Sequence, residues 1–320
     1  HICYQPPDHL PDVSISNCGV ANLQADEMRI LVTGGSGFIG KALAPKLQEY
    51  GHVSISVGRR EVGELGPNTN WLPHLKGIDA IVHLAARVHV MTDNAADPAA
   101  EFRRVNSQGT ELLAKAALAA GVKRFINLSS IKVNGDKSEL PITSVDVPAP
   151  NDPYGMSKWE AEQKLNSFAN SLEIVTLRPP LVYGAGVKGN FLKLINLVSG
   201  NWPLPLAGVT NKRSFISSVN LADAICWALS AQPGVYLPSD GDDKSTPELI
   251  IAISKALGRQ PALFNCPVSL LRIAGFLTGY SGVIQRLTGS LTVDNALPGW
   301  RPPQSFETSI IQTIQWYRYG

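Results

Sequence analysis

The sequence has few cysteines, and their spacing indicates neither a metal site nor a disulfide framework. The four are Cys3, Cys18, Cys226 and Cys266. None belongs to a Cys-x-x-Cys pair, and the first two lie in an N-terminal segment of unusual composition. We therefore expect no bound metal and a reducing, cytoplasmic setting.

An excess of charge of one sign and a long hydrophobic run are also missing. The chain has 28 Lys and Arg against 26 Asp and Glu, a net charge of +2. This balance gives no general attraction to nucleic acid or to anionic membranes. The longest apolar stretch, residues 268–287, contains Arg272 and Arg286 and so falls short of the ~18 uncharged residues of a membrane helix. We expect no nucleic-acid partner and no integral membrane segment.

The length and composition suit a globular enzyme with a sizeable core. The 320 residues are 44% hydrophobic, which is enough for one large α/β domain or two moderate ones. Residues 1–27 differ: they begin with His1, show no apolar period, and lack the basic-then-apolar layout of a signal peptide. We expect them to be a leader foreign to the fold, with Met28 as the natural start.

A glycine-rich turn follows the first predicted strand, residues 30–33. It reads Gly34-Gly35-Ser36-Gly37-Phe38-Ile39-Gly40, and a helical stretch follows it to Gln48. In such a turn the glycines let the backbone approach a pyrophosphate, and the helix N-terminus faces its charge. The pattern predicts dinucleotide binding, with contacts from Gly34, Gly37, Phe38, Ile39 and Gly40.

The second predicted strand, residues 52–57, ends in Gly58-Arg59-Arg60. Many dinucleotide folds have an acid here that binds the ribose 2′-hydroxyl. Arg59 and Arg60 would instead suit a 2′-phosphate, which favours NADP(H) over NAD(H) as cofactor. A surface arginine pair beside Glu61 is the structural alternative, so NAD(H) stays open.

The third predicted strand, residues 79–84, contains His83, which we expect to be packed in the core. The residues Leu84, Ala85 and Ala86 at its end are small enough for the backbone to lie close to a cofactor. Residues 98–120 predict a long helix. Asn106 lies in its middle, where helix propensity disfavours asparagine, which suggests a specific hydrogen bond.

A candidate proton donor follows the fourth predicted strand, residues 123–128. This strand delivers Ser130 to the edge of the sheet where open α/β folds place their chemistry. In a helix after Pro153, Tyr154 and Lys158 would share one face. A cation ~4 Å from the phenol supplies ~4 kcal/mol at an effective dielectric of ~20. We therefore expect Lys158 to lower the pKa of Tyr154 toward neutrality, although an isolated Tyr-x-x-x-Lys is more often a solvated helix face.

The alternation of strands and helices predicts an α/β fold, a Rossmann-type doubly wound parallel sheet with a smaller C-terminal α/β substrate-binding domain. A fifth strand, residues 173–177, runs into Arg178-Pro179-Pro180, and residues 215–219 and 235–237 are predicted to return to the sheet. The expected division assigns residues 28–183 and 213–245 to the dinucleotide-binding domain. Residues 184–212 and 246–320 form the substrate domain.

Together these motifs resemble the extended short-chain dehydrogenase/reductase family, which includes nucleotide-sugar epimerases, dehydratases and 4-ketoreductases. The resemblance covers residues 28 to about 306. It rests on the glycine turn, His83-Leu84-Ala85-Ala86, Ser129-Ser130, Tyr154-Gly155-Met156-Ser157-Lys158 and Leu177-Arg178-Pro179.

The resemblance implies roles for individual residues. Ser130 and Tyr154 would contact the reacting oxygen, while Lys158 would hold the nicotinamide ribose. Pro179 would lie beside the cofactor. The UDP-sugar would be bound by Ser130, Lys132, Asn190 and Arg213. The family also implies a homodimer formed through the helices at 98–120 and 153–170.

Departures from the family narrow the reaction. Its dehydratases have an acidic pair where this chain has Ile131 and Lys132, so dehydration is not expected. Its epimerases usually show Val-Tyr-Gly where this chain has Val133-Asn134-Gly135, and commonly an acid near position 59. Together with the segment Arg87-Val88-His89-Val90, these differences favour NADP(H)-dependent reduction of the C4 ketone of a UDP-6-deoxy amino sugar in bacterial surface polysaccharide synthesis.

Two other functions stay open. One is a UDP-hexose 4-epimerase, acting on UDP-glucose or UDP-N-acetylglucosamine with retained NAD. The other is a nucleotide-binding protein without turnover. The second is disfavoured because both Tyr154 and Lys158 are present.

Overall fold

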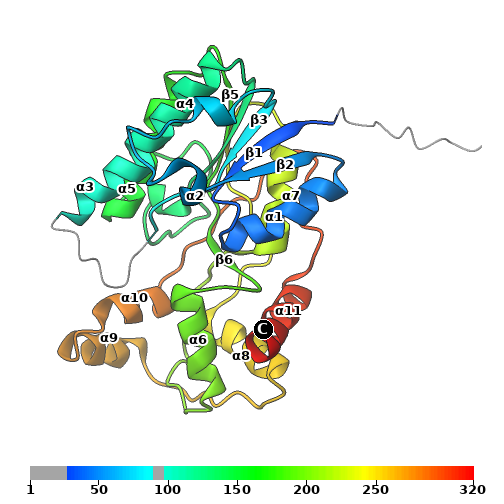
Figure 1. The fold of residues 1–320 in the computed structure, drawn as a ribbon. Helices are drawn as coiled ribbons and strands as arrows, with labels where there is room; N and C mark the ends of the chain where they lie inside the picture. The colour runs from blue at the N-terminus through cyan, green and yellow to red at the C-terminus, as the bar shows by residue number, and fades with distance from the viewer. Residues whose placement is uncertain (1–26, 89–96) are drawn as a thin grey trace, which may run out of the picture.

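A computed structural model of the chain describes residues 27–88 and 97–320. Most of the expected leader, residues 1–26, and the His89-Val90 part of the resemblance lie outside the described residues. A large sheet with helices on both faces occupies one half of the structure, and a mostly helical region lies below it (Figure 1).

The main sheet is six-stranded and parallel, in the order β2-β1-β3-β4-β5-β8. Its strands are β1 (Arg29–Thr33), β2 (Val53–Val57), β3 (Ala80–His83), β4 (Arg124–Leu128), β5 (Glu173–Leu177) and β8 (Gly234–Tyr236). The chain reverses its direction of winding between β1 and β3, and open α/β sheets bind ligands at the carboxyl ends of the strands beside such a switch point. This confirms the predicted Rossmann-type fold.

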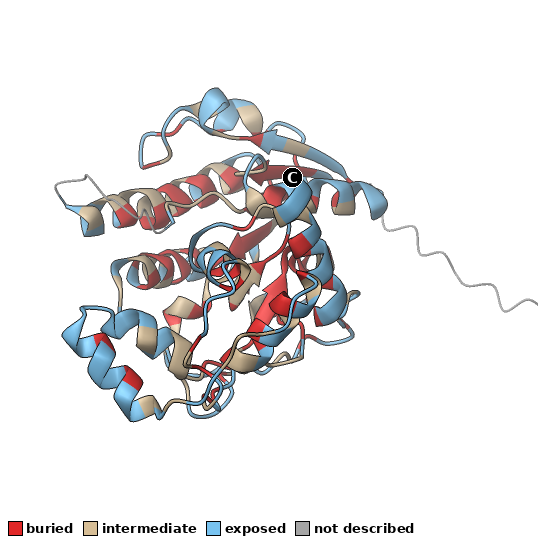
Figure 2. Cartoon of the chain, turned by 90° about the horizontal axis from the view of Figure 1, so that it is seen from below, coloured by how far each residue is buried: buried red, intermediate tan, exposed pale blue. Residues whose placement is uncertain are grey.

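Helices cover both faces of this sheet, because alternate residues of its central strands point to opposite sides. On one side Ile30 and Val32 pack in a core with α1 (Phe38–Glu49) and α7 (Ser218–Ala228). On the other side Leu31 packs in a core with α4 (Gly109–Ala119) and α5 (Pro153–Asn166). The buried strands are drawn in red between these helices in Figure 2.

The lower region has its own small sheet and its own core. Strand β6 (Leu181–Tyr183) pairs in parallel with β7 (Phe215–Ser217). The rings of Tyr183 and Phe191 stack at 5.3 Å in the core beneath this pair. The helices of the region are α6 (Gly189–Ser199), α8 (Thr246–Ala256), α9 (Val268–Leu277), α10 (Ser281–Thr288) and α11 (Phe306–Tyr319).

The predicted return of residues 215–219 to the main sheet is therefore wrong, whereas β8 does join β5. Pro179 and Pro180 follow β5 and cannot donate backbone hydrogen bonds, so the chain leaves the sheet there. The Phe215 side chain then belongs to the lower aromatic core, which holds β7 against β6.

The predicted helix at 98–120 is interrupted by a wider π-helical turn. Its parts are α3 (Pro98–Phe102), the π segment Arg103–Gln108, and α4. The π segment buries Asn106, which accepts from Arg87 N at 2.8 Å and donates to Ser157 Oγ at 3.0 Å. The expected hydrogen bond of Asn106 is confirmed, and such π turns occur frequently at functional sites.

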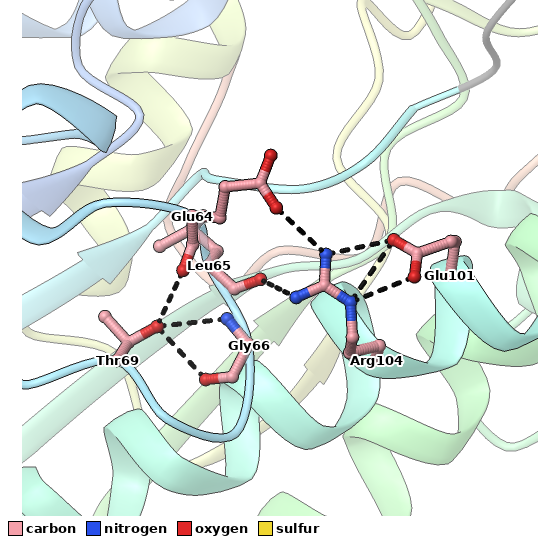
Figure 3. A network of polar contacts seen from close by, with 6 residues as sticks. All are labelled: Glu64, Leu65, Gly66, Thr69, Glu101 and Arg104. Carbon is pink, nitrogen blue, oxygen red and sulfur yellow. Dashed lines mark hydrogen bonds and ion pairs between the residues drawn. The ribbon is translucent and has the colours of Figure 1, made fainter. Parts of the chain in front are cut away.

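The same π segment holds the loop that follows α2 (Arg59–Val62) and precedes the 3-10 turn Leu72–His74. Figure 3 shows the Arg104 guanidinium between Glu101, at 2.9 Å, and Glu64, at 3.4 Å. Arg104 also donates to the carbonyl oxygen of Leu65 at 3.2 Å. This loop is therefore fixed to the helix that carries Asn106.

A buried ion pair attaches α5 to the loop after β5. Arg178 Nη2 lies 2.5 Å from Glu162 Oε2, and the side chains are 3% and 6% exposed. Ser129, after β4, donates its hydroxyl to the Glu162 carboxylate. Arg178 Nη1 donates to Asn134 Oδ1 at 3.1 Å. The ion pair thus joins α5 to the carboxyl ends of β4 and β5.

We predict that Arg178→Met lowers the free energy of unfolding by about 3–5 kcal/mol, because it leaves the Glu162 carboxylate buried without its counter-ion. Urea unfolding followed by circular dichroism measures this. The double variant Glu162→Gln/Arg178→Met should recover part of the loss, since it removes the unpaired charge. A double variant less stable than Arg178→Met alone would contradict this role.

Candidate active site

The glycine turn between β1 and α1 is built for close backbone approach. Gly34 has φ +72°, and a Cβ there would lie 2.9 Å from Ala85 N. A Cβ on Gly40 would lie 2.4 Å from Gly35 Cα. Gly37 is the N-cap of α1 and offers no capping side chain, and the first turn of α1 has no acidic residue. This arrangement fits a pyrophosphate group at the start of α1.

The turn lies beside the residues that follow β3. Ala85 N donates to Thr33 Oγ1 at 3.2 Å, which fixes the Leu84–Ala86 segment against the end of β1. Leu84, Ala85, Ala86, Phe38 and Ile39 are all partly exposed. The structure therefore brings the predicted cofactor residues from these two segments to one edge of the sheet.

The arginine pair follows the neighbouring strand. Arg59 and Arg60 form the first turn of α2, directly after β2, and both are exposed. The Glu61 carboxylate accepts from Gly58 N at 2.8 Å and so is turned toward the helix N-terminus. Both guanidiniums are accessible at the carboxyl end of β2.

Ser130 and Tyr154 meet at the carboxyl end of β4. Ser130 is the N-cap of the 3-10 turn Ile131–Val133, which is held by a 3.0 Å bond from Ile131 N to Pro179 O. Tyr154 lies in the first turn of α5, where Asp152 is the N-cap and accepts from Gly155 N at 2.7 Å. The hydroxyls of Tyr154 and Ser130 are hydrogen-bonded to each other.

Burial raises the pKa of Tyr154 to about 12, and the hydrogen bond with Ser130 opposes this rise. The expectation that Lys158 alone moves Tyr154 toward neutrality is therefore wrong for this structure. Lys158 Nζ donates to the carbonyl oxygen of Leu128 at 2.8 Å. The Tyr154 ring packs edge-on against Phe102, with centroids 6.1 Å apart. The Tyr154 side chain is partly exposed, and at neutral pH its phenol keeps its proton.

Burial also lowers the pKa of Lys158 to about 8, while the Glu162 charge opposes this shift. Lys158 is 4% exposed. The arrangement therefore provides a protonated phenol, a hydroxyl beside it, and a buried cation one helical turn away. Such a group can hold or transfer a proton at one substrate oxygen.

A chain of hydrogen bonds with defined donors and acceptors links the end of β1, beside the glycine turn, to α5. Thr110 Oγ1 donates to Asn106 O at 2.6 Å, so it must accept from His83 Nε2, 2.9 Å away. His83 Nδ1 is then free to accept from Thr33 Oγ1 at 2.7 Å. Asn106 extends the chain to Ser157 in α5. His83 is thus a core residue, as predicted.

Three members of this chain, Thr33, Thr110 and Ser157, were not predicted from the sequence. One signal for the first of them is strand position: Thr33 and His83 are paired residues at the ends of adjacent strands. The other partners come from helices whose placement depends on the π turn, which no local sequence pattern indicates.

The predicted substrate residues lie in two places. Lys132 is near Tyr154, but its ammonium is ion-paired with Asp136 and with Asp152, the latter at 3.1 Å. Asn190 is exposed at the start of α6 in the lower region. Arg213 is partly buried, and its Nη1 donates to Gly289 O at 3.1 Å.

The described residues contain neither a metal-binding cluster nor a membrane-spanning helix. Across residues 27–88 and 97–320, no three His, Cys, Asp or Glu side chains gather in a way that could hold a metal ion. No helix in those same ranges has the length and apolar character needed to cross a membrane.

The fold and site define a class of enzyme, one with a Rossmann-type dinucleotide sheet and a Ser–Tyr–Lys group at its carboxyl edge. Comparison with known proteins places the chain within this class. The profile of the NAD dependent epimerase/dehydratase family matches residues 30–237, and the chain belongs to that family. The resemblance to extended short-chain dehydrogenases/reductases is confirmed.

Individual relatives cover nearly the whole fold. A UDP-glucose 4-epimerase of Vibrio cholerae is 40% identical over 309 residues, 89% of this chain and 94% of that protein. An Escherichia coli O157:H7 N-acetyl-alpha-D-glucosaminyl-diphospho-ditrans,octacis-undecaprenol 4-epimerase is 26% identical over 283 residues, 81% of each chain.

Solved structures share the same fold. The UDP-N-acetylglucosamine 4-epimerase from Bacillus cereus has a TM-score of 0.73 at 23% identity, covering 92% of this chain and 98% of that one. MoeE5 in complex with UDP-glucose and NAD has a TM-score of 0.72 at 26% identity, covering 91% of this chain and 98% of that one.

We predict that Gly40→Ala removes bound nicotinamide dinucleotide, because its Cβ would lie 2.4 Å from the Gly35 backbone and force the turn apart. Cofactor content after purification and calorimetric titration measure this. Gly282→Ala is a matched control, since the nearest atom to its Cβ is the end of Arg286, at 3.6 Å. Equal cofactor content in the two variants would contradict the assignment of the turn.

A second prediction concerns acid stability. Burial lowers the pKa of His83 from 6.5 to about 3, so between these values the unfolded chain binds more protons than the folded one. Stability is full above pH 6.5 and falls with acidification by up to about 1.4 kcal/mol per pH unit. Unfolding free energy measured from pH 7 to 4 should fall less steeply in His83→Gln than in the unmodified chain. The control His74→Gln should match the unmodified slope, and parallel curves for all three would contradict the shift.

Proposed function

We propose that this chain is a UDP-hexose 4-epimerase, acting on UDP-glucose or UDP-N-acetylglucosamine with retained NAD(H). The observation that carries the choice among family activities is the 40% identity to a UDP-glucose 4-epimerase over 94% of that protein. The sequence alone favoured reduction of a C4 ketone, with a 4-epimerase as the alternative. The identity to an epimerase now favours that alternative.

The Ser130–Tyr154 pair supports this chemistry. Epimerisation at C4 requires oxidation of the alcohol and re-reduction from the other face, and bound NAD supplies the hydride acceptance and return. In our proposal the phenolate form of Tyr154 takes the proton of the C4 hydroxyl, and the phenol formed in this way later gives the proton back to the C4 oxygen. Ser130 holds the same oxygen. Lys158 does not bring Tyr154 toward neutrality in the ligand-free structure, so the phenolate would need the positive nicotinamide ring of bound NAD in addition to the Lys158 cation.

The lower region offers a site for the nucleotide diphosphate. Burial and the neighbouring Arg286 charge lower the pKa of Arg213, and within the described residues no carboxylate offsets either effect. Because burial and Arg286 both disfavour the positive charge of Arg213, an anionic ligand beside it would be stabilising. Guanidiniums bind phosphate oxygens in bidentate fashion. We propose that Arg213 binds the UDP diphosphate, with Asn190 at the start of α6 as a further polar contact.

The reductase remains a second candidate because of two observations. Arg59 and Arg60 are exposed at the end of β2, where they would suit the 2′-phosphate of NADPH. The pKa of Tyr154, raised to about 12, favours the protonated phenol that a ketone reduction consumes. A homodimer through the helices at 98–120 and 153–170 stays a prediction for either activity.

The proposal predicts that the purified chain interconverts UDP-glucose and UDP-galactose, or the N-acetyl pair, without added cofactor. Tyr154→Phe should lower kcat by about 10²–10⁴-fold, because the phenol proton is lost while the ring packing is kept. Tyr319→Phe, on a residue 84% exposed, is the control and should leave kcat unchanged.

The competing reductase gives a different result in the same assays. A reductase would show no interconversion, would consume NADPH with a UDP-4-keto-6-deoxy sugar, and would lose affinity for NADPH but not NADH on Arg59→Ala. Full activity in Tyr154→Phe would contradict both candidates.

A further inference from the structure

The helical hairpin α9–α10 has an unusual surface. The two helices extend from the lower region (Figure 1), and they pack against each other where Gly275 meets Ile284. In α9 only Leu271 and Gly275 are buried, and in α10 no residue is. Most of the hairpin is drawn in the colour of exposed residues in Figure 2.

The exposed face of α9 is apolar. Leu270, Ile273 and Leu277 are 54%, 56% and 77% exposed. They are spaced three and four residues apart and so lie along one face of the helix. Phe276, 78% exposed, and Tyr280, 64% exposed, extend this face toward the end of the hairpin. Contiguous exposed apolar surface of this kind marks an interaction site.

The charged residues of the hairpin and of the segments that flank it in sequence are all of one sign. From Arg259 to Val293 the chain has no Asp or Glu, and its only charged residues are Arg259, Arg272 and Arg286. A second exposed apolar segment differs from the hairpin, because it contains acids. Glu139 directly precedes Leu140, and Asp146 directly follows Val145. The hairpin combines aliphatic side chains, aromatic rings and arginines without acids, which is the composition of helices that lie in a bilayer interface.

A second copy of the chain would fit this face poorly. A two-fold contact sets the same patch against itself, and between Arg259 and Val293 the only charges that such a contact would bring together are arginines, with no acid to compensate them. An anionic lipid surface complements both the apolar stripe and the arginines.

We propose that the α9–α10 hairpin docks this protein on the surface of anionic phospholipid membranes. The exposed α9 face, Leu270, Ile273, Phe276, Leu277 and Tyr280, enters the interface, and Arg272 contacts the headgroup phosphates. The overall charge of +2 gives no indication of the acid-free, arginine-containing hairpin.

Vesicle flotation tests the proposal on the full chain, with phosphatidylglycerol/phosphatidylcholine vesicles and with phosphatidylcholine alone. We expect binding to the anionic vesicles that falls at least tenfold in Phe276→Gln/Leu277→Gln. Arg272→Gln should weaken anionic binding about fivefold and leave the weak neutral binding unchanged. Because these side chains are exposed, circular dichroism and activity on soluble UDP-sugars should match the unmodified chain.

Leu140→Gln/Val145→Gln is the matched control, since it removes equally exposed apolar side chains from the acid-flanked segment. It should leave vesicle binding unchanged. The proposal is overturned if the unmodified chain floats no better than Phe276→Gln/Leu277→Gln, or if the control lowers binding as much. It is also overturned if sedimentation velocity shows that the hairpin variant only dissociates a dimer, which would make this face an interface between copies.

Discussion

The buried ion pair between Glu162 and Arg178 is the constraint on which the site depends. It lies where α5 crosses the carboxyl ends of β4 and β5, and it also engages Ser129 and Asn134. Two charges in an interior are tolerated only when their hydrogen bonds are well satisfied. The satisfied pair therefore allows few positions of α5 relative to the sheet, and it fixes where the residues of that helix stand.

The second constraint is the polar chain from Thr33 through His83 and Thr110 to Asn106. It spans the switch point of the sheet and reaches α5 through Ser157. Since these buried donors are all paired with acceptors, the chain couples the position of the glycine turn to that of α5. The cofactor half and the proton-transfer half of the proposed site are thus parts of one hydrogen-bonded unit.

Local patterns in the sequence predicted those features of the structure that depend on residues close together in the chain. The glycine turn, the Rossmann sheet and the unusual position of Asn106 followed from spacing and propensity. The pKa of Tyr154 did not, because its direction depends on how far tertiary packing removes the phenol from water, and on the Asp152 charge and the Ser130 hydroxyl beside it. The pairing of β7 with β6 and the exposure of α9 also depend on tertiary packing. Neither can be predicted from a short segment of the sequence.

The most direct test of the proposed epimerase is to incubate the purified chain with UDP-glucose in D₂O, without added cofactor, and to follow the sugar by proton NMR. The account predicts conversion to UDP-galactose with protium retained at C4, because the hydrogen removed from that carbon is returned to it within the same site. No conversion of UDP-glucose or of UDP-N-acetylglucosamine, together with turnover only when NADPH and a 4-keto sugar are supplied, would contradict it.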